Sequence, residues 1–364
     1  MKPPLFLKHK PQRILVISLR FLGDTLLITP LLNSLKKAYP EAEIDVLTYG
    51  YNALILEGNP AISQCIFSPK KPTLHDYNVL LKQIYRRYDL AMTTQTGDRL
   101  TLYAVLAAKT RIGFIPKPTE KRRFKRYFFQ RWLTFDETKT HTVLELLRLC
   151  QLLAIKPVYE LTPPSTTQPL EISRMGITSA YVVIHVLPQW RYKQWTEAGW
   201  IAVAHHLKQQ GLQVLLSGSP VVEEVHYLMQ LQKQFPTNTI NLAGKVSLAH
   251  LAMIIEGAQL FIGPDTGITH LAAATKVKTI ALLGPSDPVK WSPWPNDYHS
   301  TTPPFKTRGC QQVNNIYIIQ GQEACVPCYS EGCERHQNSY SLCLDSIRAD
   351  QVIKTIDRAL NKPD

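Results

Sequence analysis

Residues 261–288 read FIGPDTGITHLAAATKVKTIALLGPSDP, and this stretch sets the fold class. The apolar run ending at Gly263 predicts a buried strand, ITHLAAAT predicts a helix, and TIALLG predicts a second buried strand. A polar loop, GPDTG or GPSDP, follows each strand. Ligands of open parallel sheets bind beyond the carboxyl ends of the strands. The stretch therefore predicts part of a parallel α/β domain with a binding site at that edge.

The loop GPDTG has the features of an anion site. Asp265 is a favourable N-cap residue, so the amides of Thr266 and Gly267 would point outward at a helix N-terminus that suits a diphosphate. Gly267 would let an anion approach the backbone closely. The alternative is that Asp265 only caps a helix and the glycines only turn the chain.

Length and composition predict two domains with an anionic partner. The 364 residues exceed the roughly 250 to 300 at which single cores stop growing. No apolar run reaches the roughly 18 to 20 residues of a membrane helix, and the N-terminus lacks the apolar centre of a signal peptide, so we expect a cytoplasmic protein. The formal net charge of +13 suits nucleic acid, anionic lipid or a phosphorylated sugar.

Strand and helix patterns alternate in both halves of the chain, as in doubly wound sheets. In the first half we predict strands at 13–19, 43–48, 65–67 and 88–94, and helices at 25–40, 80–88, 99–108 and 141–153. In the second half we predict strands at 181–186 and 213–218 and helices at 196–210, 221–235 and 248–256, before the opening stretch. The expected division is an N-terminal domain, 1–160, a Pro-rich linker, 161–175, a C-terminal domain, 176–345, and a final helix, 346–364.

Residues 109–131 form a basic and aromatic segment. Nine Lys or Arg residues stand against the single acid Glu120, interleaved with five aromatic residues. One interpretation is a surface that docks an anionic, partly apolar partner such as a lipid headgroup region. The other is a solvated basic helix face.

Three further polar residues follow predicted strands. Asp24, in LRFLGDTLL, is either a helix cap or a general base that takes the proton of an attacking hydroxyl. Lys193, in LPQWRYKQW, is either a surface lysine or the cation that neutralises a diphosphate leaving group. Glu223, with Glu224 as its rival, is either a helix-start acid or an acceptor of ribose hydroxyls.

Several segments together resemble glycosyltransferase family 9, the lipopolysaccharide heptosyltransferases, and come closest to the heptosyltransferase III branch. They are RILVISLRFLGDTLLITPLLNSLKKAYPEAEIDVL, KQW, GSPVVEE, and GPDTGITHLAAA followed by GPSDP. The resemblance implies an α/β protein of GT-B architecture, with two doubly wound Rossmann-like domains facing across a cleft. It also implies inverting, metal-independent transfer of heptose from ADP-heptose to a hydroxyl of the inner core on lipid A.

The same resemblance implies roles for individual residues. Asp24 falls on the general base, and the donor would be held by Lys193, Glu223, Asp265, Thr266, Gly267 and His270. Glu224, the next residue, is the alternative to Glu223, and His270 is alternatively a core histidine. A basic acceptor surface is expected to include Arg20, Arg99, Arg122 and Arg123. The residues before the lysine, Pro188, Gln189 and Trp190, depart from the small hydroxyl residues or glycines that the family often has there.

The remaining expectations concern metal, partners and place. Cys325, Cys328, Cys333 and Cys343 form CxxCx4Cx9C, which can hold a structural zinc, although the second pair lacks the usual close spacing. The expected partners are the nucleotide-sugar donor, the lipid A–core acceptor and, peripherally, the cytoplasmic face of the inner membrane, with no nucleic acid. The alternatives are a family 9 enzyme for another nucleotide sugar and a non-catalytic protein that binds polyanions or membrane surfaces.

Overall fold

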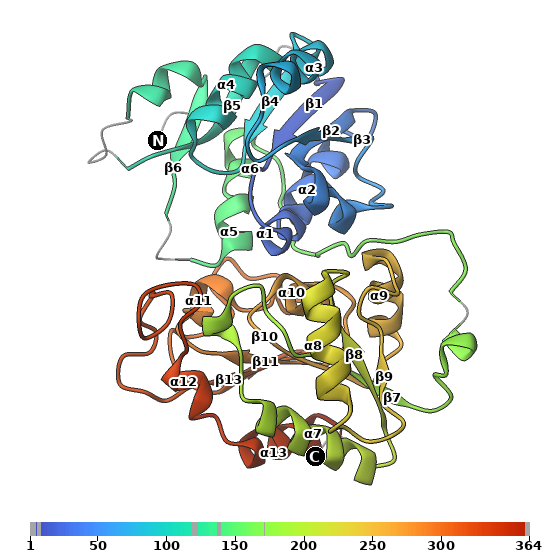
Figure 1. Ribbon diagram of the computed structural model, residues 1–364. Coiled ribbons are helices and arrows are strands. Elements are labelled where there is room, and N and C mark those ends of the chain that lie inside the picture. The colour runs from blue at the N-terminus through green and yellow to red at the C-terminus, as the bar shows by residue number, and fades with distance from the viewer. Residues whose placement is uncertain (1–4, 6–8, 118–122, 137–139, 171, 361–364) are drawn as a thin grey trace. The chain divides into compact units, whose positions relative to one another are not determined.

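The computed structural model describes residues 5, 9–117, 123–136, 140–170 and 172–360. The chain divides into two compact units, Met1–Pro164 and Ser165–Asp364. Each unit is built around one mostly parallel sheet with helices against it (Figure 1). No helix among the described residues is long and apolar enough to span a membrane.

The N-terminal unit contains a six-stranded parallel sheet with strand order β3-β2-β1-β4-β5-β6. Its strands are β1 (Arg13–Ile17), β2 (Glu43–Tyr49), β3 (Gln64–Ser68), β4 (Tyr88–Thr93), β5 (Ala108–Ile115) and β6 (Arg131–Thr134). Its helices are α1 (Leu22–Leu26), α2 (Thr29–Ala38), η1 (Gly50–Leu56), α3 (Leu74–Ile84), α4 (Asp98–Ala107), η2 (Arg123–Phe128), α5 (Thr142–Leu147) and α6 (Leu149–Leu152). This is the strand order of the Rossmann fold, and the order reverses between β1 and β4.

The C-terminal unit repeats this order and adds one strand. Its sheet runs β12-β13-β11-β10-β7-β8-β9, and only the edge strand β12 pairs antiparallel. The strands are β7 (Tyr181–His185), β8 (Gln213–Ser217), β9 (Ile240–Asn241), β10 (Leu260–Pro264), β11 (Thr279–Leu283), β12 (Gln311–Val313) and β13 (Ile316–Gln320). The helices are η3 (Ile172–Met175), η4 (Arg191–Lys193), α7 (Glu197–Gln209), α8 (Val222–Gln232), α9 (Leu248–Glu256), α10 (Gly267–Ala274), α11 (Pro288–Trp291), α12 (Leu342–Asp345) and α13 (Ala349–Leu360). The order here reverses between β7 and β10.

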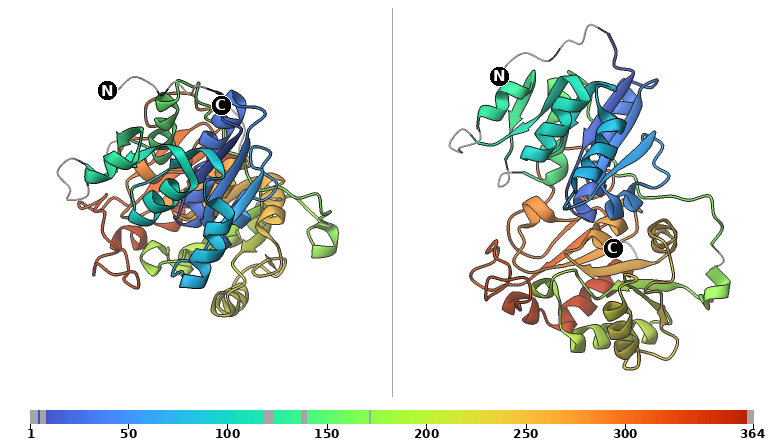
Figure 2. Two further views of the ribbon diagram at one scale, coloured as in Figure 1. Left: turned by 90° about the horizontal axis from the view of Figure 1, so that it is seen from above. Right: turned by 45° about the horizontal axis from the view of Figure 1, so that its top comes forward.

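The central strands are apolar on both faces because helices cover both faces of each sheet. In β1, Leu15 and Ile17 pack with α3 and α4, and the alternation of a strand turns the equally buried Ile14 and Val16 the other way. In the C-terminal unit, one face of the sheet packs on α7, α8 and α13, and the other packs on α10. Figure 2 shows these layers from two further directions.

Local differences from the sequence prediction have simple causes. The single helix predicted at 25–40 is two helices, because Pro30 lies in the first turn of α2, where its missing N–H does no harm. The helix predicted at 141–153 is likewise divided into α5 and α6. The strands β5, β6, β12 and β13 were not predicted. β6 and β12 have only four and three residues, too few to show a period, whereas β5 and β13 were missed although both contain apolar residues.

Candidate active site

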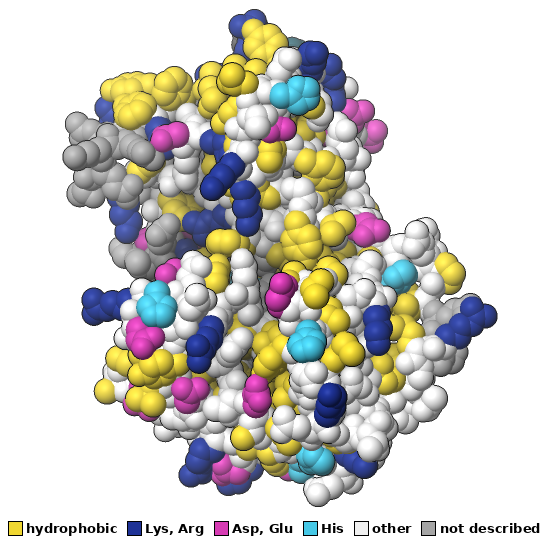
Figure 3. Space-filling view, in the orientation of Figure 1, with side chains coloured by type: hydrophobic (Ala, Val, Ile, Leu, Met, Phe, Trp, Pro, Cys, Tyr) yellow, Lys and Arg dark blue, Asp and Glu magenta, His cyan; other side chains and the backbone are white. Residues whose placement is uncertain are grey.

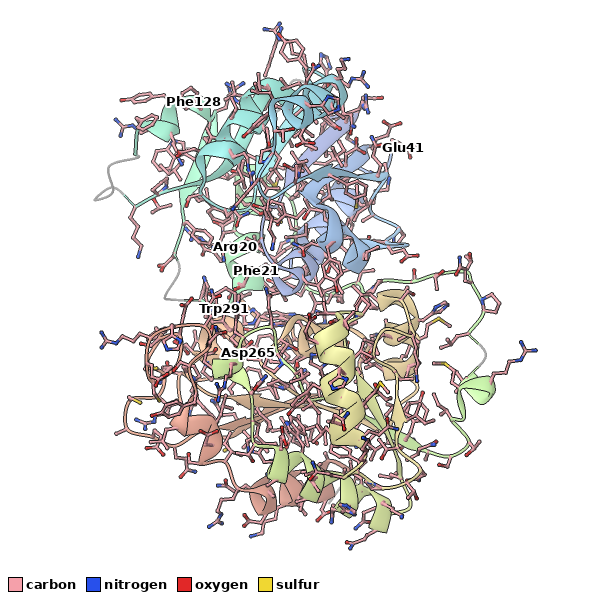
Figure 4. All side chains as sticks on the ribbon, viewed as in Figure 1. Arg20, Phe21, Glu41, Phe128, Asp265 and Trp291 are labelled. Atoms are coloured by element: carbon pink, nitrogen blue, oxygen red, sulfur yellow. The ribbon has the colours of Figure 1, made fainter. Side chains whose placement is uncertain are left out.

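Three loops of the C-terminal unit leave adjacent strands at the point where the strand order reverses. Lys193 lies in η4 after β7, Asp265 follows β10, and Ser286 follows β11 (Figure 4 labels Asp265). Such a reversal opens a crevice at the carboxyl ends of the strands, where ligands of this fold bind.

Asp265 joins these three loops through one of its oxygens. Lys193 Nζ donates to Asp265 Oδ2 at 2.7 Å, and Ser286 Oγ donates to the same atom at 2.6 Å. The described residues make no hydrogen bond to Oδ1. One carboxylate oxygen therefore fixes the loops while the other can accept a hydrogen bond from a ligand hydroxyl.

The charges around Asp265 are coupled. Burial alone would raise the pKa of its carboxyl, but Lys193, His270 and the hydrogen bond from Ser286 hold that pKa below its usual value. Burial lowers the pKa of His270 to about 4; the carboxylate of Asp265 opposes this shift and Lys193 adds to it. At neutral pH the site therefore combines an ionised Asp265 with a neutral His270.

The start of α10 differs from the sequence prediction. The N-cap is Thr266, whose hydroxyl accepts from the amide of Thr269, so the assignment of Asp265 as the cap is wrong. The cause is the extra extended residue between β10 and the helix, which leaves the Asp265 side chain to bind Lys193. The amides of Gly267 and Ile268 begin the helix without i−4 carbonyl partners, as an anion site requires.

The unusual loop before Lys193 supplies aromatic rings. Trp190 and Tyr192 stack with their ring centroids 6.0 Å apart, and Lys193 Nζ lies 5.3 Å and 5.9 Å from the two centroids. A cation over aromatic faces is held electrostatically. In this chain, two aromatic rings position the lysine.

The two acids at the start of α8 differ in their contacts. Glu223 is exposed and makes no hydrogen bond or ion pair with the described residues. Glu224 accepts hydrogen bonds from the amide and the hydroxyl of Ser219, at 2.9 Å for the amide. Glu224 thus braces the loop after β8, and Glu223 projects from the same first turn.

In the N-terminal unit, Asp24 lies in the first turn of α1, whose N-cap is Phe21. Arg20 connects it to the neighbouring strand end: its guanidinium lies 3.6 Å from Asp24 Oδ1, and its Nε donates to Gln95 Oε1 at 2.5 Å. Gln95 follows β4, so this cluster occupies the reversal point of the first sheet, between β1 and β4. Figure 4 labels Arg20 and Phe21 there.

The other expected acceptor residues are less informative. Arg99 donates to Tyr49 Oη at 2.6 Å and to the carbonyls of Lys70 and Pro69 at 3.0 and 3.3 Å, so much of its donor capacity holds the end of β2 and the loop after β3. Arg122 and the side chain of Arg123 lie outside the described residues.

Four of the five cysteines of the C-terminal unit, Cys325, Cys328, Cys333 and Cys343, line one small cavity of about 80 Å³. Cys343 is buried, and its thiol pKa is raised to about 12 by burial and by the other three cysteines. Within the described residues, no group of three or more His, Cys, Asp or Glu side chains is arranged to hold a metal ion. The structure gives the zinc hypothesis no support.

Sequence reasoning missed Ser286 and Gln95. Ser286 lies in the loop GPSDP after β11, and Gln95 lies in the polar loop after β4. Polar residues just after neighbouring parallel strands come together at one edge of the sheet, and this rule could have identified both. The sequence patterns did not reveal the strand order, and without that order one cannot tell which loops are neighbours.

Comparison with known proteins gives the family. The model of glycosyltransferase family 9 (heptosyltransferase) matches residues 79–330. The chain belongs to glycosyltransferase family 9. This glycosyltransferase is 30% identical to Lipopolysaccharide heptosyltransferase 3 of Escherichia coli, over 82% of its own chain and 93% of that relative.

Solved structures show the same fold. The family 9 glycosyl transferase of Veillonella parvula superposes with a TM-score of 0.75 at 20% identity, covering 96% of this chain and 97% of that one. The E. coli ADP-heptose lps heptosyltransferase II superposes with a TM-score of 0.72 at 19% identity, covering 96% and 98%. The glycosyltransferase therefore has the GT-B architecture of two Rossmann-like domains.

Proposed function

We propose that this family 9 glycosyltransferase transfers heptose from ADP-heptose to a hydroxyl of the lipopolysaccharide inner core. The observation that carries the proposal is the Lys193–Asp265–Ser286 cluster beside the start of α10. It offers a cation, two helix-start amides and a free carboxylate oxygen, which suit the diphosphate and the sugar hydroxyls of a nucleotide sugar. The names of the relatives supply the identity of that sugar.

The C-terminal unit would hold the donor. As the bond between the anomeric carbon and the diphosphate breaks, ADP leaves with the electron pair, and Lys193 with the amides of Gly267 and Ile268 stabilises the developing charge. Asp265 Oδ1 accepts from a sugar hydroxyl. No metal is assigned to this step, since residues of the chain supply the positive charge.

Asp24 would complete the reaction as general base. The acceptor oxygen forms its bond to the anomeric carbon from the face opposite the leaving diphosphate, and its proton passes to the Asp24 carboxylate. The ion pair with Arg20 keeps this carboxylate oriented and places a second cation beside it for an acidic or phosphorylated acceptor. Because this acceptor is a lipid, we place the reaction at the cytoplasmic face of the inner membrane.

The test replaces the base and leaves the donor site intact. In Asp24→Asn we expect turnover to fall by about 10² to 10⁴, with ADP-heptose affinity near that of the wild type in calorimetry. The matched control is Glu41→Gln, an exposed acid of the same unit that Figure 4 labels. Turnover retained in Asp24→Asn would remove this residue from the mechanism.

The donor is tested separately with a panel of nucleotide sugars. A ligand at a hundred times its dissociation constant stabilises a protein by about 2.7 kcal/mol, so ADP-heptose should raise the unfolding temperature more than UDP- or GDP-sugars do. Preferential stabilisation and transfer by another nucleotide sugar would favour the alternative donor. Membership of a glycosyltransferase family argues against the non-catalytic alternative.

A further inference from the structure

The short helix η2 buries a charged residue and exposes aromatic residues, which is the reverse of an ordinary amphipathic helix. Lys125 is buried, with 3% of its surface exposed, whereas Phe124, Tyr127 and Phe128 are 53%, 75% and 41% exposed. Lysine is among the side chains least often buried and phenylalanine among those most often buried. The aromatic rings of η2 are therefore exposed to solvent and its lysine is buried, although the residue types favour the reverse.

Specific contacts impose this orientation. Lys125 Nζ lies 2.7 Å from Asp98 Oδ1 in the first turn of α4. Phe129, the residue that follows η2, is buried and anchors the end of this helix. Arg111 of β5 donates from Nε to the carbonyl of Phe128 at 2.5 Å. The segment is thus held against α4 and β5 by its lysine and its backbone, and the rings remain on the outer side.

The exposed rings stand among basic side chains. The rings of Phe124 and Phe128 meet edge to face, with centroids 6.4 Å apart, and the Arg126 guanidinium lies 4.8 Å from the centroid of Tyr127. Residues 109–131 carry nine Lys or Arg against one acid. Figure 4 shows Phe128 at the edge of the N-terminal unit, and Figure 3 shows hydrophobic side chains beside Lys and Arg in the same region.

We propose that this surface, Phe124, Arg126, Tyr127 and Phe128, docks the N-terminal unit onto an anionic phospholipid bilayer. Aromatic rings favour the boundary between headgroups and acyl chains, and arginine favours the negative surface of a bilayer. A purely ionic partner would satisfy Arg126 and leave three rings in water, so charge and apolarity together select the lipid surface. The inference rests on the proposed function, in which the acceptor is a lipid, and adds how the enzyme reaches it.

Vesicle sedimentation of the full-length protein tests the surface. We expect binding to vesicles of phosphatidylcholine with phosphatidylglycerol and little binding to phosphatidylcholine alone. Arg126→Gln should weaken the partition by about fivefold, because a basic residue near an anionic surface contributes about 1 kcal/mol. The triple variant Phe124→Ser, Tyr127→Ser, Phe128→Ser should weaken it by more than about tenfold.

The matched control removes exposed apolar residues elsewhere in the same unit. Leu74 and Val79 on α3 are 89% and 43% exposed, and Leu74→Ser with Val79→Ser should bind vesicles as the wild type does. Equal loss in this control, wild-type binding by the triple variant, or equal binding to neutral vesicles overturns the proposal.

A second readout separates docking from chemistry. The triple variant should lose transfer to an acceptor embedded in anionic vesicles and keep transfer to the same core oligosaccharide released from its lipid. Loss of transfer to both acceptors would show that the rings serve catalysis or folding and would contradict docking. Absence of transfer by the wild type would refute the proposed function, while sedimentation still decides whether the surface binds lipid.

Discussion

Lys193 and Asp265 hold each other in place before any ligand arrives. Their contact of 2.7 Å is largely buried, and removing one partner of such a pair leaves the other as an uncompensated charge. The same pair is also the proposed phosphate site. Replacing either residue of this pair should therefore affect both stability and donor binding.

Lys193→Met should show both effects. We expect kcat/KM for ADP-heptose to fall by about 10² to 10³, the range for loss of one charge-stabilising group. The free energy of unfolding should fall by about 3 kcal/mol, since Asp265 stays buried. Steady-state kinetics and urea denaturation measure the two, and Lys354→Met, at an exposed position of α13, is the control that should change neither. An unchanged kcat/KM would contradict the assignment.

His270 should make stability depend on pH. Its folded pKa of about 4 lies below the value of about 6.5 for a free histidine, so the folded state binds its proton less readily than the unfolded state. Its contribution is complete above about pH 6.5 and is lost as pH falls toward about 4. Between about pH 7 and pH 5 the loss should be about 2 kcal/mol.

Denaturation of the wild type and of His270→Gln at the two pH values measures this contribution. It is the difference between the two proteins in how far the free energy of unfolding changes with pH. His185 is also buried with a lowered pKa, and its contribution cancels because both proteins contain it. Identical changes in the two proteins would show that His270 does not titrate in this window.

At the scale of elements, the start of α10 depends on one hydroxyl. Thr266→Ala removes the N-cap and should cost about 1 kcal/mol of stability. That corresponds to a fall of roughly 2 to 4 °C in the unfolding temperature of a unit this size. Thr266→Ser keeps the hydroxyl and should unfold like the wild type. Equal losses in both variants would mean that packing, and not capping, is at stake.

The sequence predicted elements better than contacts. Apolar runs placed β1, β7, β8 and β10 within about two residues, because buried parallel strands are apolar on both faces. The cap of α10 was misplaced because Asp265 and Thr266 are both good cap residues, and only the position of Lys193 shows which is otherwise engaged. The orientation of η2 was beyond prediction, since it depends on Asp98, a distant residue.

At the scale of the molecule, two sheets share one strand order and each collects polar residues at its reversal point. Asp24, Arg20 and Gln95 lie at the first point, and Lys193, Asp265 and Ser286 lie at the second. The alternation of strands and helices predicted the doubly wound class. The order itself, and with it the partners Gln95 and Ser286, came only from strand pairing.

The C-terminal unit should fold and bind nucleotide by itself. Its last helix, α13, packs on α7 of the same unit, so residues 165–364 include their whole core. Expressed alone, this fragment should unfold cooperatively and bind ADP with an affinity within about tenfold of the full chain. Lys193→Met in the fragment is the control that should weaken ADP binding. A fragment that folds without binding would assign part of the nucleotide site to residues before 165.

The packing of α13 within the C-terminal unit also affects how genes for such two-unit proteins can recombine. The boundary between the compact units falls once along the chain, after Pro164. A recombination event near that codon would exchange the whole C-terminal unit, including α13 and the α7 helix on which it packs. If the two units hold donor and acceptor as proposed, one lineage can inherit its choice of sugar from one ancestor and its choice of acceptor from another.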